Sequence, residues 1–140
     1  MKFLVDTCVL SELVKKVPDR NVVTWVNDQD ENDLAISVLT LGELEKGISK
    51  LDTSKRKQIL ERWLNEELVP RFENRILEID EQAGLLWGQI CGAAEREGGA
   101  LPAIDSLLAA SAMAHRLTFV TRDSAAIARC GVRCLNPWEG

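Results

Sequence analysis

The sequence contains no long apolar run and no segment that resembles a linker. Its longest uncharged apolar run, residues 106–114, is far shorter than the ~20 residues that a membrane span requires. Near the N-terminus Asp6 interrupts a short apolar run, so no secretory signal is visible. We therefore expect a cytoplasmic protein with no membrane partner. No repeat and no Pro/Gly/Ser-rich stretch divides the 140 residues, which predicts one domain over residues 1–140.

Ligands for a soft metal are scarce. The only histidine is His115, and no two of the four cysteines form a C-x-x-C pair. A zinc site is therefore poorly supported. The pattern favours reduced thiols that pack as small apolar groups, at Cys8, Cys91, Cys130 and Cys134.

Positive charge is also in short supply. The chain has 17 Lys and Arg against 22 Asp and Glu, a formal net charge of −5. This balance argues against broad electrostatic adhesion to nucleic acid. It does not exclude a nucleic-acid enzyme whose clustered carboxylates hold cations.

Short apolar runs alternate with helical patterns along the chain. The runs predict buried strands at residues 2–5, 34–37, 75–79, 117–120 and 132–135. Between them, helical spacing predicts helices near residues 20–26, 41–51, 60–68 and 83–94, with Val69-Pro70 ending the third. A further helix opens at Pro102 as its first residue and is apolar nearly all round, so we expect it to be buried. The pattern predicts an α/β fold, a central parallel sheet with helices on both faces.

Three acidic residues lie where strands end or helices begin, and each has an ordinary structural interpretation. Asp6 directly follows the first strand and could cap the next helix. The segment from Thr40 to Glu43 fits a capping box, with Thr40 as the N-cap. Asp123 follows the strand at residues 117–120 and could cap the short helix after it.

Asp105 has a less ordinary position. It lies between Ile104 and Leu107 on the apolar helix, past the expected cap. Burying an unpaired charge is costly, so this carboxylate needs either a salt-bridge partner or a ligand.

Taken together, the acids predict a metal site. Ligands bind parallel α/β sheets outside the carboxyl ends of the strands, where all four could face one crevice. Gathered carboxylates repel one another unless a cation is present. Ligation by oxygen alone suits Mg²⁺ or Mn²⁺, and such an ion can assist in-line displacement at a phosphodiester.

Four segments in order resemble the PIN domain family, in particular the VapC-like toxin ribonucleases of bacterial toxin–antitoxin systems. They are LVDTCVLSEL, ISVLTLGELEKGI, LPAIDSLLAASAMAH and FVTRD. The resemblance implies a metal-dependent endoribonuclease that acts on RNA as a homodimer and is blocked by a cognate antitoxin wrapped across the site. It implies that the catalytic and metal-binding residues are Asp6, Glu43, Asp105 and Asp123, with supporting hydroxyls at Thr7 and Thr121.

Other interpretations stay open. Lys46 and Lys50 share a helix face with Glu43 and could contact RNA, although a solvated surface explains them equally well. A Mg²⁺-binding receiver domain also gathers acids at strand ends, but it expects paired acids near the first strand and a late lysine. In a non-catalytic binding module, all four acids would be caps or salt-bridge partners.

Overall fold

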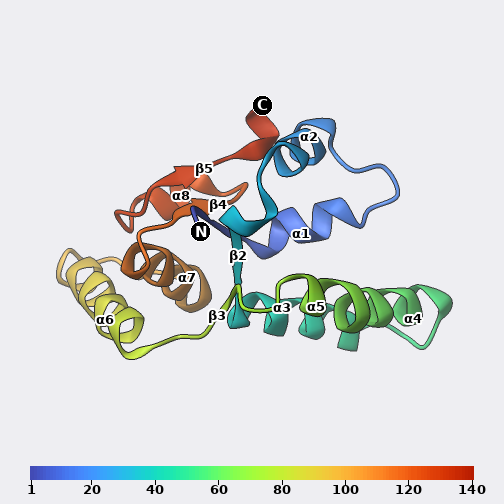
Figure 1. The fold of residues 1–140 in the computed structure, drawn as a ribbon. Coiled ribbons are helices and arrows are strands. Elements are labelled where there is room, and N and C mark those ends of the chain that lie inside the picture. Colours follow the sequence, from blue (N-terminus) through green and yellow to red (C-terminus); the bar gives the residue numbers. More distant parts are fainter.

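The computed structural model describes residues 1–140 and contains one five-stranded sheet in the order β3-β2-β1-β4-β5 (Figure 1). Every neighbouring pair is parallel, which confirms the predicted α/β fold. The strands are β1 (Phe3–Val5), β2 (Leu34–Ser37), β3 (Ile76–Leu77), β4 (Thr118–Val120) and β5 (Cys134–Leu135). The two edge strands are shorter than predicted, since an edge strand has only one neighbour to pair with.

One face of the sheet is covered by the helices from the first half of the chain. Val5, Ile36 and Val120 point to this side and are almost completely buried. They pack against α1 (Thr7–Leu13), α2 (Arg20–Asp28) and α3 (Val38–Ser49), among other helices. A short turn of 3₁₀ helix, η1 (Glu31–Asp33), leads from α2 into β2.

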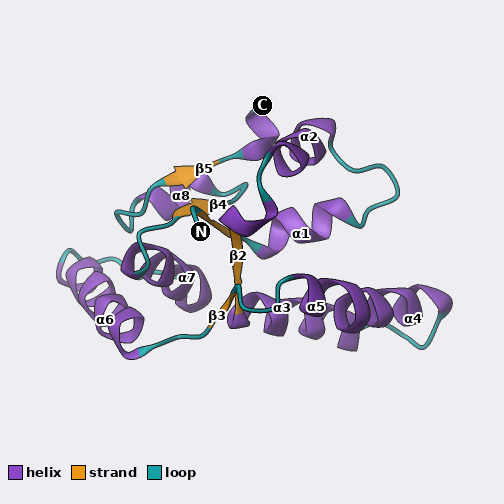
Figure 2. Cartoon of the chain, in the orientation of Figure 1, coloured by secondary structure: helices purple, strands orange, loops and turns teal.

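Helices from the second half cover the opposite face (Figure 2). Leu4, Ala35 and Phe119 alternate with the residues named above and pack against α7 (Ala103–Ala114) and α8 (Ser124–Ala128). Helix α6 (Glu81–Arg96) lies on α7, and the short η3 (Pro137–Glu139) ends the chain beside α2. The prediction of helices on both faces is therefore confirmed. No helix of the chain combines the length and apolar character needed to cross a membrane.

The helix predicted to stop at Val69-Pro70 continues past the proline. It comprises α4 (Lys55–Arg62), the π-helical η2 (Trp63–Leu68) and α5 (Val69–Arg71). Proline lacks an N–H, and its ring clashes with the carbonyl four residues earlier. The wider π turn comes directly before Pro70, and the N–H of Val69 bonds the carbonyl of Leu64, five residues back. The proline therefore changes the helix locally without ending it.

Helix α7 departs from its prediction at its N-terminus. Pro102 is the N-cap instead of the first helical residue. The centre of the helix is buried, but Ile104 is 39% exposed, so the expectation of burial all round is wrong. Twelve helical residues span about 18 Å, whereas a three-residue strand spans about 10 Å. The first turn therefore extends beyond the sheet that covers the rest.

Helices α1 and α2 are linked by a buried acid. The Glu12 side chain is 7% exposed, accepts a hydrogen bond from Lys15 Nζ at 2.8 Å and accepts another from the backbone N–H of Asp19 at 2.9 Å. These two bonds, followed by the charges of Lys15 and Arg122, hold the pKa of Glu12 below its usual value against the opposing effect of burial. Asp19 in turn caps α2 through the N–H groups of Asn21 and Val22.

Candidate active site

The strand order reverses at β1, which pairs with β2 on one side and β4 on the other. Chain connections leave in opposite directions from such a point, and ligands of open parallel sheets bind there. Asp6 follows β1 and Thr121 follows β4 at this position. The Thr121 hydroxyl donates a 2.8 Å hydrogen bond to Asp6 Oδ2, joining residues 115 apart in sequence.

Asp6 is a helix cap and also part of this junction. Its side chain is the N-cap of α1, and Oδ1 accepts the Thr7 N–H at 2.8 Å. Oδ2 accepts the Thr121 hydroxyl and, at 3.6 Å, the Cys8 thiol. The residue is only 9% exposed. The interpretation of Asp6 as a helix cap is thus correct. A functional role of the same carboxylate is compatible with it.

Asp123 occupies the N-cap position of α8, but its side chain caps no N–H group. Its own backbone N–H donates to Thr121 Oγ1 at 3.2 Å. Thr121 therefore links the segment that carries Asp123 to the carboxylate of Asp6. The interpretation of Asp123 as a side-chain cap is wrong, and its exposed carboxylate remains available.

Glu43 is not part of a capping box. Helix α3 begins at Val38, directly after β2, and the cap is Ser37, whose Oγ accepts the Leu39 N–H at 3.1 Å. Thr40 is already inside the helix and completely buried. Glu43 therefore lies beyond the first turn, where its Oε1 accepts the Thr7 hydroxyl at 2.6 Å. Thr7 thus links the carboxyl end of β1 to α3. In the same way, Thr121 links the carboxyl ends of β1 and β4.

Asp105 lies in the first turn of α7 and is partly buried. Because α7 runs back towards the start of β4, its first turn is at the carboxyl edge of the sheet. No ion pair and no hydrogen bond of the structure involves the Asp105 side chain; the salt bridges join other residues. The salt-bridge interpretation of Asp105 is therefore wrong.

The four acids influence one another electrostatically. Burial raises the pKa of Asp6, and the charge of Glu43 adds to the increase, against hydrogen bonds from Thr121, Thr7 and Cys8 that lower it. Burial also raises the pKa of Asp105, followed by the charges of Glu43 and Asp123. Glu43 thus acts on two of the other acids, and Asp123 acts on one. Such mutual repulsion is expected where carboxylates face one site without a cation.

Cys8 lies within this group, a position for which the sequence offered no role. Burial raises the pKa of its thiol to about 11, and the neighbouring Asp6 charge contributes next. The thiol is therefore neutral at ordinary pH and donates to Asp6 instead of acting as a thiolate nucleophile. Nothing in the local sequence around Cys8 predicts its contact with Asp6.

The donor set fits a hard divalent cation. Carboxylate and hydroxyl oxygens dominate, and the only sulfur is the protonated Cys8. No three acidic, histidine or cysteine side chains are close enough together to enclose an ion directly. Mg²⁺ usually keeps several waters and binds through one or two carboxylates, so a hydrated ion would not need three direct protein ligands.

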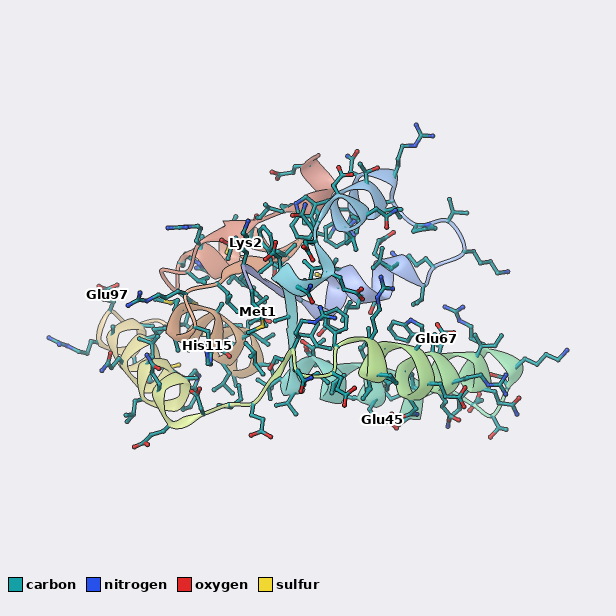
Figure 3. All side chains as sticks on the ribbon, in the orientation of Figure 1. Met1, Lys2, Glu45, Glu67, Glu97 and His115 are labelled. Atoms are coloured by element: carbon teal, nitrogen blue, oxygen red, sulfur yellow. The ribbon has the colours of Figure 1, made fainter.

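Lys46 and Lys50 lie farther along α3, at its last turn and C-cap. Both are exposed, and neither side chain forms a hydrogen bond or an ion pair. Figure 3 shows the neighbouring Glu45 and, on the following helical segment, Glu67 among the side chains of this part of the molecule.

Comparison with known proteins identifies the family. The PIN domain model matches residues 3–131. The chain belongs to the PIN domain family. This PIN domain is 35% identical over 136 residues to toxin FitB of Neisseria gonorrhoeae, covering 97% of this chain and 98% of FitB. It is 33% identical to VapC ribonuclease Y4jK of Sinorhizobium fredii, covering 97% of each chain.

A solved structure agrees with these relatives. The crystal structure of FitAcB from Neisseria gonorrhoeae matches the PIN domain with a TM-score of 0.92 and 34% identity, covering 99% of both chains. The family resemblance seen in the four sequence segments is confirmed, and the receiver-domain alternative is wrong.

Proposed function

We propose that this PIN domain is the toxin of a toxin–antitoxin pair and hydrolyses RNA phosphodiester bonds as a Mg²⁺- or Mn²⁺-dependent endoribonuclease. The observation that carries the proposal is the hydrogen-bonded group at the switch point of the sheet, where Thr7 and Thr121 hold the carboxylates of Asp6 and Glu43. The names of two relatives, a toxin and a ribonuclease, support the same function. The proposed catalytic and metal-binding residues are Asp6, Glu43, Asp105 and Asp123.

Each acid has a distinct part. Asp6 is fixed by Thr7 and Thr121 and presents a carboxylate whose position does not depend on the ligand. Glu43 has one oxygen occupied by the Thr7 hydroxyl, and its second oxygen can accept a hydrogen bond from the attacking water. Asp105 and Asp123 carry no side-chain bonds and can turn towards a cation. When bound, Mg²⁺ would orient the water and offset charge on the phosphodiester.

The proposal extends to the partner and the cellular location of this PIN domain. A toxin requires a cognate antitoxin in the cell that makes it, and a cationic side chain of that partner would fit among the uncompensated carboxylates. We further propose a homodimer that acts in the cytoplasm as one domain over residues 1–140. Four free cysteines suit a reducing compartment. Lys46 and Lys50 remain candidates for contacts with the RNA backbone.

The direct test is cleavage of RNA by the purified chain. We expect cleavage with Mg²⁺ or Mn²⁺, none with EDTA, and a loss of about a thousandfold in Asp105→Asn, since several kcal/mol of charge stabilisation disappear. Asp52→Asn is the matched control, because Asp52 is exposed and its side chain makes no bond. An Asp105→Asn variant that cleaves at the parental rate would remove Asp105 from the active site.

A cellular test separates the toxin from a non-catalytic binding module. Expression of the intact chain alone should slow growth of a host that carries no antitoxin. Co-expression of a small neighbouring reading frame should restore growth. RNA binding without cleavage, together with normal growth, would favour the binding module.

A further inference from the structure

One arginine lies on the chain segment between two residues of the candidate site and packs on an aromatic ring. Arg122 lies between Thr121 and Asp123, on the segment that leaves β4 at the carboxyl edge of the sheet. Its guanidinium carbon is 5.1 Å from the centre of the Trp138 ring. The residue is exposed, and its side chain forms neither an ion pair nor a hydrogen bond within the protein. An arginine held on an aromatic face with all its donors unused is available to an external ligand.

The aromatic face is itself well anchored. Asn136 Oδ1 accepts the Trp138 N–H at 2.9 Å, and Asn136 Nδ2 donates to the Arg122 carbonyl at 3.2 Å. From α2, Asn21 Nδ2 donates to the Trp138 carbonyl at 2.9 Å, and the Trp138 ring packs against the main core. Because β4 and β5 are parallel neighbours, the segments after them emerge at the same edge. Figure 1 shows the C-terminal turn beside α2. Through Asn136 this turn supports the backbone of the segment that carries Arg122.

The buried acid Glu12 does not form an ion pair with Arg122. Arg122 contributes only a minor part of the influence on Glu12, whose oxygens already accept Lys15 and the Asp19 N–H. The contrast with Lys46 and Lys50 is clear, since those side chains have no support from an aromatic ring or a neighbouring segment. An RNA strand approaching an acidic edge needs at least one positive group there to offset repulsion.

We propose that Arg122, held on Trp138, binds a backbone phosphate of the RNA substrate beside the scissile bond and so positions that bond over the carboxylates. The inference rests on the proposed function for the identity of the ligand. Arginine suits this role because its planar fork can donate two parallel hydrogen bonds to one phosphate, and because it is less strongly hydrated than lysine. Trp138 is a positioning residue that acts through Arg122.

The first experiment measures binding without cleavage. Anisotropy of a short fluorescein-labelled single-stranded RNA of mixed sequence is followed with Ca²⁺ in place of Mg²⁺. Arg122→Gln should weaken binding by about tenfold, the size of one charge-assisted hydrogen bond. It should also reduce the slope of log K against log salt by about 0.7, the value for one phosphate of a single strand. Arg122→Lys should keep the slope and lose part of the affinity.

The matched control is Arg116→Gln, which makes the same charge change. Arg116 is exposed and lies between α7 and β4, at the opposite edge of the sheet. The Arg116→Gln substitution should leave both the RNA affinity and the salt slope unchanged. Equal losses in the Arg116 and Arg122 variants would mean that only net charge matters, and this would overturn the proposal.

A double-mutant cycle tests the role of Trp138. Trp138→Leu should weaken RNA binding in the parental protein and have no further effect in the Arg122→Gln background, since the ring acts through the guanidinium. A merely structural loss would appear in both backgrounds and in the melting temperature. If Trp138→Leu weakens binding equally in both backgrounds with an unchanged melt, the ring itself stacks on RNA, and its supporting role is overturned.

Cleavage kinetics separate this inference from the proposed function. With Mg²⁺, Arg122→Gln should raise KM by about tenfold with a smaller change in kcat. Parental binding and kinetics in Arg122→Gln, with normal cleavage by the wild type, would overturn the inference and leave the ribonuclease intact. RNA binding that depends on Arg122 without any cleavage would do the reverse. No binding by the wild type would overturn both.

Discussion

Asp6 and Asp105 show how differently one acidic site can treat two carboxylates. Both have a raised pKa, for which burial is the largest cause. Asp6 nevertheless accepts hydrogen bonds from Thr7, Cys8 and Thr121, whereas Asp105 accepts none. The Asp6 carboxylate is thus part of the hydrogen-bond network of the fold, and the Asp105 carboxylate is not. The position of a ligand-binding carboxylate can therefore be held by hydrogen bonds of the protein, as at Asp6, or be left for the ligand to set, as at Asp105.

The comparison predicts that the two acids matter equally for the chemistry and unequally for stability. Removing the Asp6 carboxylate leaves the Thr7 N–H and the Thr121 hydroxyl without their acceptor. Removing Asp105 strands nothing and lowers the repulsion among the remaining acids.

Metal binding should stabilise the wild type and depend on the unbonded carboxylate. At free Mg²⁺ or Mn²⁺ near 100 times Kd, the gain is ~2.7 kcal/mol, or several degrees in the melting temperature. Asp105→Asn should lose most of this gain and Asp52→Asn should keep it. Thermal melts in EDTA and in excess metal give the comparison, and superimposable wild-type melts would contradict a preformed site.

Asp6→Ala should destabilise the metal-free protein by about 1–3 kcal/mol, because the Thr7 N–H and the buried Thr121 hydroxyl lose their acceptor. Asp105→Ala should stay within about 0.5 kcal/mol of the wild type, as expected where no bond is lost. Urea unfolding in EDTA measures both variants. A larger loss in Asp105→Ala than in Asp6→Ala would reverse the proposed contrast.

Thr7→Val should separate the orientation of Glu43 from its charge. The substitution keeps the side-chain shape and removes the 2.6 Å hydrogen bond to Glu43. We expect a loss of about 1 kcal/mol in stability and a decrease of about tenfold in kcat. Thr24→Val, at an exposed site on α2, is the control. Unchanged cleavage by Thr7→Val would show that Glu43 needs no hydroxyl to hold it.

The smallest effect is the pH dependence of the Asp105→Asn variant in EDTA. Because burial raises the folded-state pKa of Asp105 above the ordinary value of 3.8, the folded state binds protons more tightly than the unfolded state. Ionised Asp105 therefore costs stability above the raised pKa, and this cost disappears as the pH falls through that pKa to below 3.8. Asp105 is only partly buried, so solvent screening keeps the cost below about 1 kcal/mol.

Asp105→Asn should thus be slightly more stable than the wild type at neutral pH, and the difference should vanish near pH 3.5. Denaturant unfolding at both pH values measures the difference. An advantage of the variant that grows on acidification would have the wrong sign and would contradict the raised pKa.

Local patterns in the sequence determined the α/β fold and the placement of acids at the ends of predicted strands. The run at residues 34–37 became β2 with those bounds, since a buried strand needs only a short apolar segment between polar ones. Local capping was less predictable. Ser37 displaced Thr40 as the cap of α3, because the helix starts wherever the strand ends, and that point depends on pairing with β1 and β3.

Only the tertiary structure decided which acids became bonded and which stayed open. The bonds from Thr7 to Glu43 and from Thr121 to Asp6 join residues 36 and 115 apart in sequence. Sequence periodicity reports which face of an element is buried, but it does not report the strand order that brings β1 beside β4. The same strand order placed Arg122 on Trp138, although neither residue carries a local signal for the contact. Such contacts arise from packing between distant segments, so they appear only when the sheet has formed.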